Sequence, residues 1–189
     1  MFIVLEGIDG SGKTTVAKEL YNYLVGKDFK VILTREPTDG PIGRFIRNYI
    51  FRLSQRNPLI EALLFASDRL WHNENIIKPN LSKVDYIISD RYIYSSLAYQ
   101  TNSEISEGFI YLINKGIVFP KYAFFIDVKP ETAFSRINHA KNIFEELNFL
   151  KRVYSKYVDL SDRGFLIRIP GQRDAKDIMN DILSYILKK

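Results

Sequence analysis

The chain has 189 residues, of which 46% are hydrophobic and 26% charged, as expected for one globular domain, residues 1–189, with a sizeable core. It contains no cysteine, which excludes disulfides and thiolate metal sites, and no apolar run reaches the roughly 20 residues of a membrane span. The net charge of +5 is dispersed among acidic residues and the N-terminus leads directly into a β-rich run, so we expect a cytoplasmic protein with no signal peptide and no nucleic-acid or membrane partner.

The first predicted strand, Phe2–Ile8, runs into a glycine-rich loop and then into a predicted helix, Lys13–Val25. Residues 7–14 read Gly-Ile-Asp-Gly-Ser-Gly-Lys-Thr and fit the pattern G-x-x-x-x-G-K-[ST] at every fixed position. A plain glycine turn is the simpler interpretation, but the flanking strand and helix favour a phosphate loop. Lys13, which we expect to be an exposed loop lysine, would reach the outer phosphates, and the Thr14 hydroxyl would bind Mg²⁺. The residues expected to bind the nucleoside triphosphate here are Gly7, Asp9, Gly10, Ser11, Gly12, Lys13, Thr14 and Thr15.

Further β-rich apolar runs follow, and helical patterns separate them. This alternation predicts an α/β protein with a parallel sheet and helices on both of its faces. Ligands of such sheets bind beyond the carboxyl ends of the strands. The further strands are predicted at Lys30–Thr34, Tyr86–Ser89, Tyr122–Val128 and Gly164–Ile169, and the further helices at Ile42–Leu53, Leu59–Leu81, Glu104–Lys115, Glu131–Ile137, Phe144–Leu160 and Ala175–Leu187.

Charged residues follow the second and third predicted strands. Asp90 comes directly after an apolar run, and in phosphate-loop proteins an acid at such a strand end holds Mg²⁺ directly or through water. Arg91 would grip a phosphate with its planar guanidinium. The alternative is a turn pair that caps the next helix. Arg35 and Glu36, before Pro37, are equally compatible with an ordinary strand end.

Phe65 and Arg69 are four residues apart in a predicted helix and therefore share a face. They would supply a stacking surface and a directional donor to a ligand, although an amphipathic helix with a core Phe and a solvated Arg has the same pattern. Arg47 lies in the preceding predicted helix and, considered alone, is expected to be a surface arginine. The histidines, His72 and His139, lack metal-ligand spacing and are expected to be surface or packing residues.

Several segments together resemble the thymidylate kinase family in their order and spacing. The specific signal is the segment Asp90–Gln100, because a phosphate loop by itself indicates only a superfamily. The resemblance implies a three-layer P-loop kinase fold with a five-stranded parallel sheet. It implies phosphoryl transfer from MgATP to dTMP, giving dTDP and ADP, and a homodimer. The other matching segments are Phe2–Thr15, Thr34–Pro37, Ile46–Arg47, Leu64–Arg69 and, more loosely, Phe125–Val128 and the last helix.

On this resemblance, the base and sugar of dTMP would meet residues of the segments Leu64–Arg69 and Asp90–Gln100. Phe65 corresponds to the surface under the thymine ring, and Arg69 to a donor to a thymine carbonyl. Ser96 and Gln100 would contact the base edge. Tyr99 corresponds to the residue that crowds the sugar 2′ position and favours deoxyribose.

The same resemblance assigns the phosphate contacts. Arg47 and Arg91 correspond to ligands of the acceptor phosphate. Asp9 and Glu36 would contact the sugar hydroxyl or metal-bound water. Arg173, in Gly171-Gln172-Arg173, falls in the loop on the adenine side of ATP.

Catalysis would depend on cations around the transferred group, supplied by Lys13, Arg91 and Mg²⁺. The segment Arg136–Asn142 lies in an expected short lid, about 136–146, where many relatives carry a longer and more arginine-rich stretch. Arg136 and Lys141 are the candidates for its catalytic cation, with Arg136 preferred.

Other functions stay open at this point. A kinase of another nucleoside monophosphate would share the phosphate loop. A small GTPase switch needs a base-reading Asn-Lys-x-Asp, and Asn114-Lys115-Gly116-Ile117 lacks its acid. A nucleic-acid-binding module is raised only by the net charge and would show salt-dependent binding to DNA.

Overall fold

The strands form where the sequence carries its apolar runs, at β1 (Phe2–Glu6), β2 (Val31–Arg35), β3 (Tyr86–Asp90), β4 (Tyr122–Asp127) and β5 (Ile167–Pro170). In the computed structural model, which describes residues 1–48, 57–137 and 143–187, they build the expected five-stranded parallel sheet in the order β2-β3-β1-β4-β5. β1 lies in the middle, and every one of its residues is buried because both of its faces are covered.

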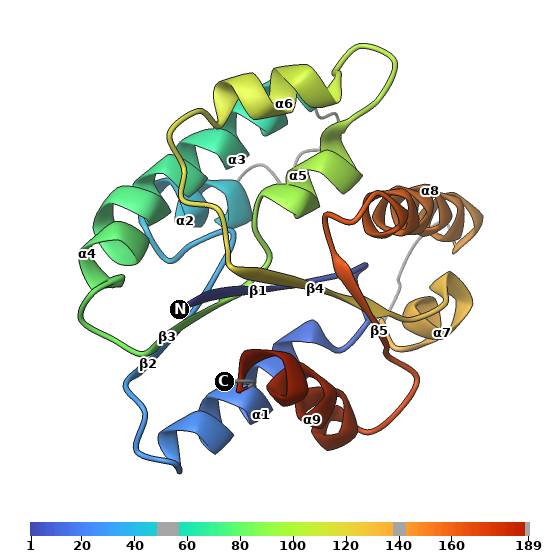
Figure 1. The fold of residues 1–189 in the computed structure, drawn as a ribbon. Helices are drawn as coiled ribbons and strands as arrows, with labels where there is room; N and C mark the ends of the chain where they lie inside the picture. The colour runs from blue at the N-terminus through green and yellow to red at the C-terminus, as the bar shows by residue number, and fades with distance from the viewer. Residues whose placement is uncertain (49–56, 138–142, 188–189) are drawn as a thin grey trace.

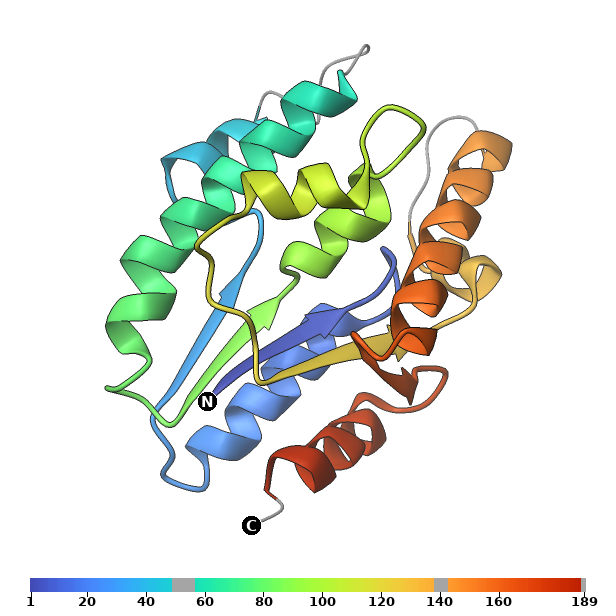
Figure 2. The ribbon, with the colours of Figure 1, turned by 45° about the horizontal axis from the view of Figure 1, so that its top comes forward.

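Helices cover both faces of the sheet, so the fold has three layers (Figure 1). On one face, α1 (Lys13–Val25) packs beside α9 (Ala175–Ile186). On the other face lie α3 (Pro58–His72), α5 (Ile93–Gln100) and α8 (Ile143–Asp162), and Figure 2 shows α5 and α8 side by side above the strands. The remaining helical segments are α2 (Pro41–Asn48), the π-helical turn η2 (Asn73–Ile77), α4 (Lys78–Asn80), α6 (Glu107–Ile113) and α7 (Pro130–Ser135).

The sequence misses one helix of the described chain, α5. Its residues include Ile, Tyr and Ser, which have modest helix propensity, so the pattern does not favour a helix there. The predicted strand Gly164–Ile169 was also too long, because α8 continues to Asp162 and Gly164 turns the chain with a φ of 80°. The predicted helix Leu59–Leu81 is α3, η2 and α4 in direct succession, and that at Ile42–Leu53 is described only as far as Asn48.

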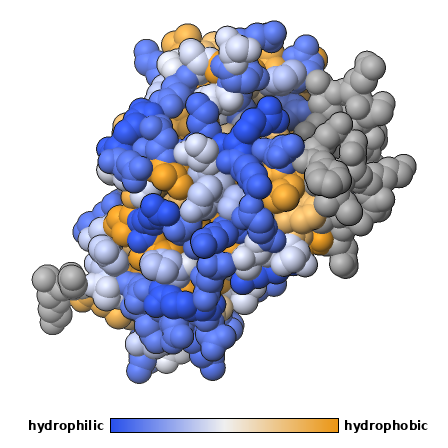
Figure 3. All heavy atoms as spheres, turned by 90° about the vertical axis from the view of Figure 1, so that its right-hand side faces the viewer, coloured by the Kyte–Doolittle hydropathy of each residue, from blue (hydrophilic) through white to orange (hydrophobic). Residues whose placement is uncertain are grey.

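Among the helices of the described ranges, no stretch is both long enough and apolar enough to cross a bilayer. Figure 3 shows that hydrophilic side chains cover most of the face seen from the right-hand side of Figure 1, with small apolar spots between them.

Candidate active site

The carboxyl ends of β1, β2 and β3 meet at one place, because Asp90 at the end of β3 is paired with Leu5 of β1 and with Arg35 of β2. The loop after β1 and the helix start that follows it border a cleft of about 570 Å³ at this edge of the sheet. Charged residues line much of the cleft. They include Asp9, Lys13, Arg35, Glu36, Asp90, Arg91, Arg136, Arg173 and Asp174.

The loop of residues 7–14 turns back on itself before α1. Gly10 and Gly12 have φ angles of 78° and 91°, in the left-handed region that glycine tolerates. The Ser11 N–H donates to the Ile8 carbonyl at 3.2 Å, so the chain curls and the start of α1 faces the cleft. Backbone N–H groups and the positive end of the α1 dipole thereby face the cleft, where they would attract an anion.

The structure corrects the expectation of an exposed Lys13. Only 5% of Lys13 is accessible, and its ammonium donates to the Ile8 carbonyl at 2.8 Å and to the Ser11 hydroxyl at 3.4 Å. Burial, with a smaller contribution from the charge of Arg91, lowers the Lys13 pKa to about 8. An anion in the loop would oppose both effects and favour the charged ammonium.

Thr14 and Asp90, predicted to hold Mg²⁺, lie against each other, with the Thr14 hydroxyl donating to Asp90 Oδ2. Asp90 Oδ1 is buried and has no hydrogen-bond partner among the described residues. An unpaired carboxylate oxygen beside a hydroxyl fits a hard cation such as Mg²⁺. The described residues hold no group of three or more acidic, His or Cys side chains that could bind a metal, so phosphate oxygens and water would complete the coordination.

Arg91 is held in a strained backbone conformation, with a φ of 76° that non-glycine residues rarely adopt. Its guanidinium donates to the Gly7 carbonyl at 3.1 Å and to the Ser95 hydroxyl at 3.0 Å, and it pairs with Asp9. It also lies 5.0 Å from the centre of the Tyr99 ring. These contacts hold the positively charged guanidinium of Arg91 beside the phosphate loop.

Tyr99 joins Arg91 to the loop. Its hydroxyl donates to Asp9 Oδ2 at 3.1 Å and accepts the Asp9 backbone N–H at 3.1 Å. Partial burial opposes ionisation of the Asp9 carboxyl, but the charges of Arg91 and Lys13 hold its pKa below the ordinary value. Asp9 is therefore ionised at neutral pH and balances part of the positive charge in the cleft.

Glu6, which sequence reasoning did not single out, anchors α5. Its buried carboxylate accepts the backbone N–H groups of Tyr92 and Ser95 at 2.8 and 3.1 Å, and the hydroxyls of Ser95 and Tyr157 at 2.7 and 2.8 Å. Burial raises the Glu6 pKa, and these donors act against the rise. Glu6, at the end of β1, thus caps the distant helix α5, and no local sequence pattern predicts this contact.

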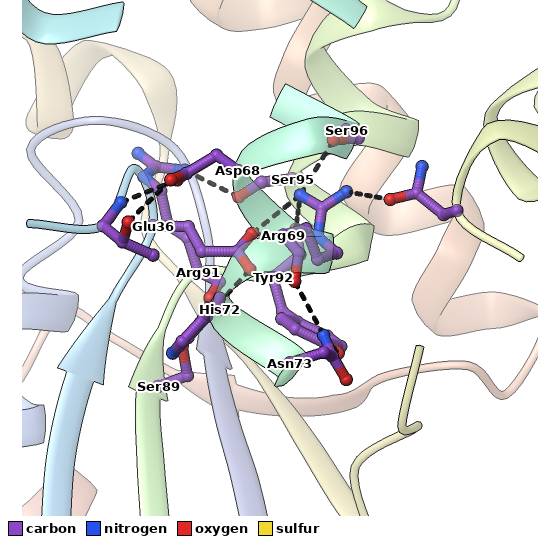
Figure 4. A network of polar contacts seen from close by, with 12 residues as sticks. Glu36, Asp68, Arg69, His72, Asn73, Ser89, Arg91, Tyr92, Ser95 and Ser96 are labelled. Atoms are coloured by element: carbon purple, nitrogen blue, oxygen red, sulfur yellow. Dashed lines mark hydrogen bonds and ion pairs between the residues drawn. The ribbon is translucent and has the colours of Figure 1, made fainter. Parts of the chain in front are cut away.

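A second buried network joins β2, α3, α5 and α6, as Figure 4 shows. The Arg69 guanidinium donates through Nε to Glu36 Oε2 at 2.9 Å and through a terminal nitrogen to Asn114 at 2.7 Å. Another terminal nitrogen donates to the Ser96 hydroxyl at 2.9 Å and to the Tyr92 carbonyl at 3.1 Å. Arg69 is 1% exposed, so this is no solvated surface arginine.

Other residues that the sequence predicts to bind the nucleotide that accepts the phosphate lie around this network. The Gln100 side chain is 7% exposed, and its amide oxygen has no partner within the described part of the chain. Phe65 is partly buried, one turn before Arg69 on α3. Arg47 donates to the Pro37 carbonyl and pairs with Asp39 at 2.8 Å. None of these three residues is part of the lining of the cleft, which Glu36 of the network reaches. Their ligand roles stay predictions.

The remaining predicted cations are Arg136, Arg173 and Lys141. Arg136 lines the cleft and donates to the Gly10 carbonyl at 3.3 Å. Arg173 lines it from the β5–α9 loop, donates to the Pro170 carbonyl and pairs with Asp181. Lys141, like His139, falls in residues 138–142 of the expected lid, which lie outside the described residues.

Comparison with known proteins gives one consistent family. The family model described as thymidylate kinase matches residues 5–182. A protein of Methanocaldococcus jannaschii named "Probable thymidylate kinase" is 38% identical over 98% of this chain and 95% of its own length. Proteins of the same name are 40% identical in Sulfolobus acidocaldarius, over 94% and 91%, and 38% identical in Methanococcus maripaludis, over 100% and 96%.

We predict that Gly10→Ala destabilises the ligand-free protein more than Gly12→Ala does. Both substitutions force a left-handed φ, but a Cβ at Gly10 would lie 2.2 Å from the Ala133 carbonyl oxygen, whereas at Gly12 it would meet nothing within 4 Å. Overpacking of this kind costs about 1–3 kcal/mol beyond the shared backbone strain. Urea unfolding measures the difference, and equal losses would contradict the close approach of α7 to the loop.

Proposed function

The chain belongs to the thymidylate kinase family, and we propose that it transfers the terminal phosphoryl group of MgATP to dTMP, giving dTDP and ADP. One observation carries the proposal. The phosphate loop after β1 borders a charged cleft, and Glu36, the carboxylate of the buried polar network after β2, lines the same cleft. This arrangement suits a reaction in which a donor and an acceptor phosphate must meet.

The loop binds the donor. Its N–H groups and Lys13 would surround the outer phosphates of ATP, and Arg173 would lie on the adenine side. Thr14 and Asp90 would hold Mg²⁺, which when bound neutralises charge on the outer phosphate oxygens. The unpaired Asp90 Oδ1 supports this assignment.

The residues in and around the network of Glu36 and Arg69 would bind dTMP. Phe65 would lie against the thymine ring, and Gln100 would accept the base N–H with its unpaired amide oxygen. Arg69 and Ser96, already paired with each other, would read the base edge. Arg47 and Arg91 would hold the acceptor phosphate, with Asp9 and Glu36 near the sugar hydroxyl.

Phosphoryl transfer then needs alignment rather than a base. A dTMP phosphate oxygen is largely deprotonated at neutral pH, so it attacks the terminal phosphorus directly. The bond from that phosphorus to the bridging oxygen breaks, and ADP leaves with the electron pair. Lys13, Arg91 and Arg136 would stabilise the charge on the transferred group from the loop, β3 and α7 sides of the cleft. Arg136 begins the segment of about 136–146 that we propose as a short lid.

We propose that two copies associate through the outer face of α2 and α3. Large apolar side chains are 44–53% exposed there, at Phe45, Leu59, Ile60 and Leu63. A group of apolar residues on adjacent helices is typical of an interface between protein chains. The absence of cysteine from the sequence fits the reducing cytoplasm, in which we propose that the enzyme acts.

We predict that Lys13→Met lowers kcat by about 10²-fold or more, since it removes a preorganised charge from the transition state while keeping much of the buried volume. Initial rates of ADP formation with dTMP measure this. Lys18→Met, an exposed lysine on the same helix, is the matched control and should keep near-normal turnover. Normal turnover in Lys13→Met would contradict the ATP-site assignment.

We predict that Tyr99→Ala relaxes discrimination against ribose, since the ring would occupy the space of a 2′-hydroxyl. The ratio of kcat/KM for dUMP to that for UMP measures the effect without the thymine methyl group. Tyr99→Phe keeps the ring and should keep the ratio, although it loses the contacts of the hydroxyl with Asp9. A ratio that is unchanged in Tyr99→Ala would refute the steric role.

We predict that Ile60→Glu with Leu63→Glu converts the protein to a monomer, since two negative charges from each copy would be buried in the apolar interface of the proposed dimer. Sedimentation equilibrium measures the mass. Val25→Glu, at a residue 43% exposed at the end of α1 on the other face of the sheet, should leave the dimer intact. If the parent protein is itself a monomer, the apolar face of α2 and α3 is not a dimer interface and the proposal is wrong.

A further inference from the structure

His72, at the end of α3, is a buried polar side chain that the reaction described above does not use. It is 0% exposed, so it is a packing residue and not a surface one. Yet both ring nitrogens have partners. Nδ1 lies 3.0 Å from Glu36 Oε1 (Figure 4). Nε2 lies 2.9 Å from the Thr34 hydroxyl.

The ring thus connects a residue within β2 to the carboxylate just beyond its end. The two oxygens of Glu36 are divided between two partners. Oε2 accepts from Arg69, at 2.9 Å from Nε and 2.8 Å from a terminal nitrogen, and Oε1 faces His72. Glu36 lines the cleft, so its orientation matters to whatever binds there.

The proton positions on a neutral ring follow from the partners. An ionised carboxylate only accepts hydrogen bonds, so Nδ1 must carry the proton that faces Glu36. Nε2 is then an acceptor, and the Thr34 hydroxyl donates to it. Glu36 therefore selects the tautomer with the proton on Nδ1, and the Thr34 hydroxyl supports it by donating to Nε2.

We propose that His72 is a positioning residue for the acceptor site. By donating to Glu36, it fixes the carboxylate that orients Arg69, and Arg69 in turn holds the Ser96 hydroxyl at 2.9 Å. A rotated Glu36 would leave Arg69 buried beside a misplaced charge, which is unfavourable for both side chains. The proposal rests on the acceptor site proposed above, with dTMP as its ligand.

Two amide substitutions separate positioning from packing. In His72→Asn, the amide nitrogen lies near the position of Nδ1 and keeps a donor to Glu36. In His72→Gln, the amide reaches the position of Nε2, keeps a partner for Thr34 and loses the donor to Glu36. Gln fills the cavity better than Asn, so a role in packing alone predicts that Gln is the milder change.

We expect the opposite order. His72→Gln should raise the KM for dTMP about tenfold or more, the effect of one lost hydrogen bond to a charged group, while His72→Asn should raise it less than about threefold. The KM for ATP should stay the same in both variants. Thr34→Val, which removes only the hydroxyl and keeps the shape, should raise the KM for dTMP by an intermediate factor. Thr34→Val also tests the positioning role of His72 if a His72 variant fails to fold.

The outcomes separate this proposal from the proposed function. A parent enzyme that phosphorylates dTMP, with Gln milder than or equal to Asn and Thr34→Val unaffected, overturns the positioning role alone. A parent enzyme that prefers another nucleoside monophosphate overturns the choice of dTMP. The same order of KM values for that acceptor would then support His72, and the reverse order would refute it.

Discussion

The ion pair between Glu36 and Arg69 is the interaction around which the acceptor side of the molecule is organised. The two side chains are 3% and 1% exposed, and the charged atoms lie 2.8 Å apart. A buried pair is tolerated only when its remaining donors and acceptors are also satisfied, and losing one partner costs about 3–5 kcal/mol. That requirement brings Asn114 of the α6 end, Ser96 of α5 and His72 of α3 to the same place. The end of β2 is thereby tied to three helices that the chain reaches much later.

A second buried carboxylate, Glu6, organises the side of the cleft that faces the phosphates. It holds the first turn of α5 through Tyr92 and Ser95 and reaches α8 through Tyr157. Because Arg91 lies two residues before α5 and Tyr99 lies within it, a fixed helix start fixes both groups near the phosphate loop. Two acids at the ends of β1 and β2, the strands on either side of β3, thus place one helix between the proposed donor and acceptor, which is the alignment that phosphoryl transfer requires.

Local patterns predict the sheet and the phosphate loop because those features depend on residues that are close together in the sequence. Alternating apolar and helical segments give the parallel sheet, and the pattern of Gly7 to Thr14 gives the loop. The sequence does not reveal α5, the burial of Lys13 or the contacts of Glu6 and His72. Each depends on partners far away in the chain, such as Tyr157 for Glu6 and Thr34 for His72. Family resemblance points to Arg69 as a ligand donor, but only the structure shows that most of its donors are already engaged within the protein.

The most direct measurement is the initial rate of ADP formation from MgATP with each of five acceptors: dTMP, dUMP, UMP, CMP and AMP. If the cleft is organised for thymidylate, dTMP has the highest kcat/KM. In that case dUMP follows at about a tenth of that value or less for want of one methyl group, and the ribonucleotides react more slowly still. A higher kcat/KM for any ribonucleotide, or ADP formation that no acceptor accelerates, would contradict the account.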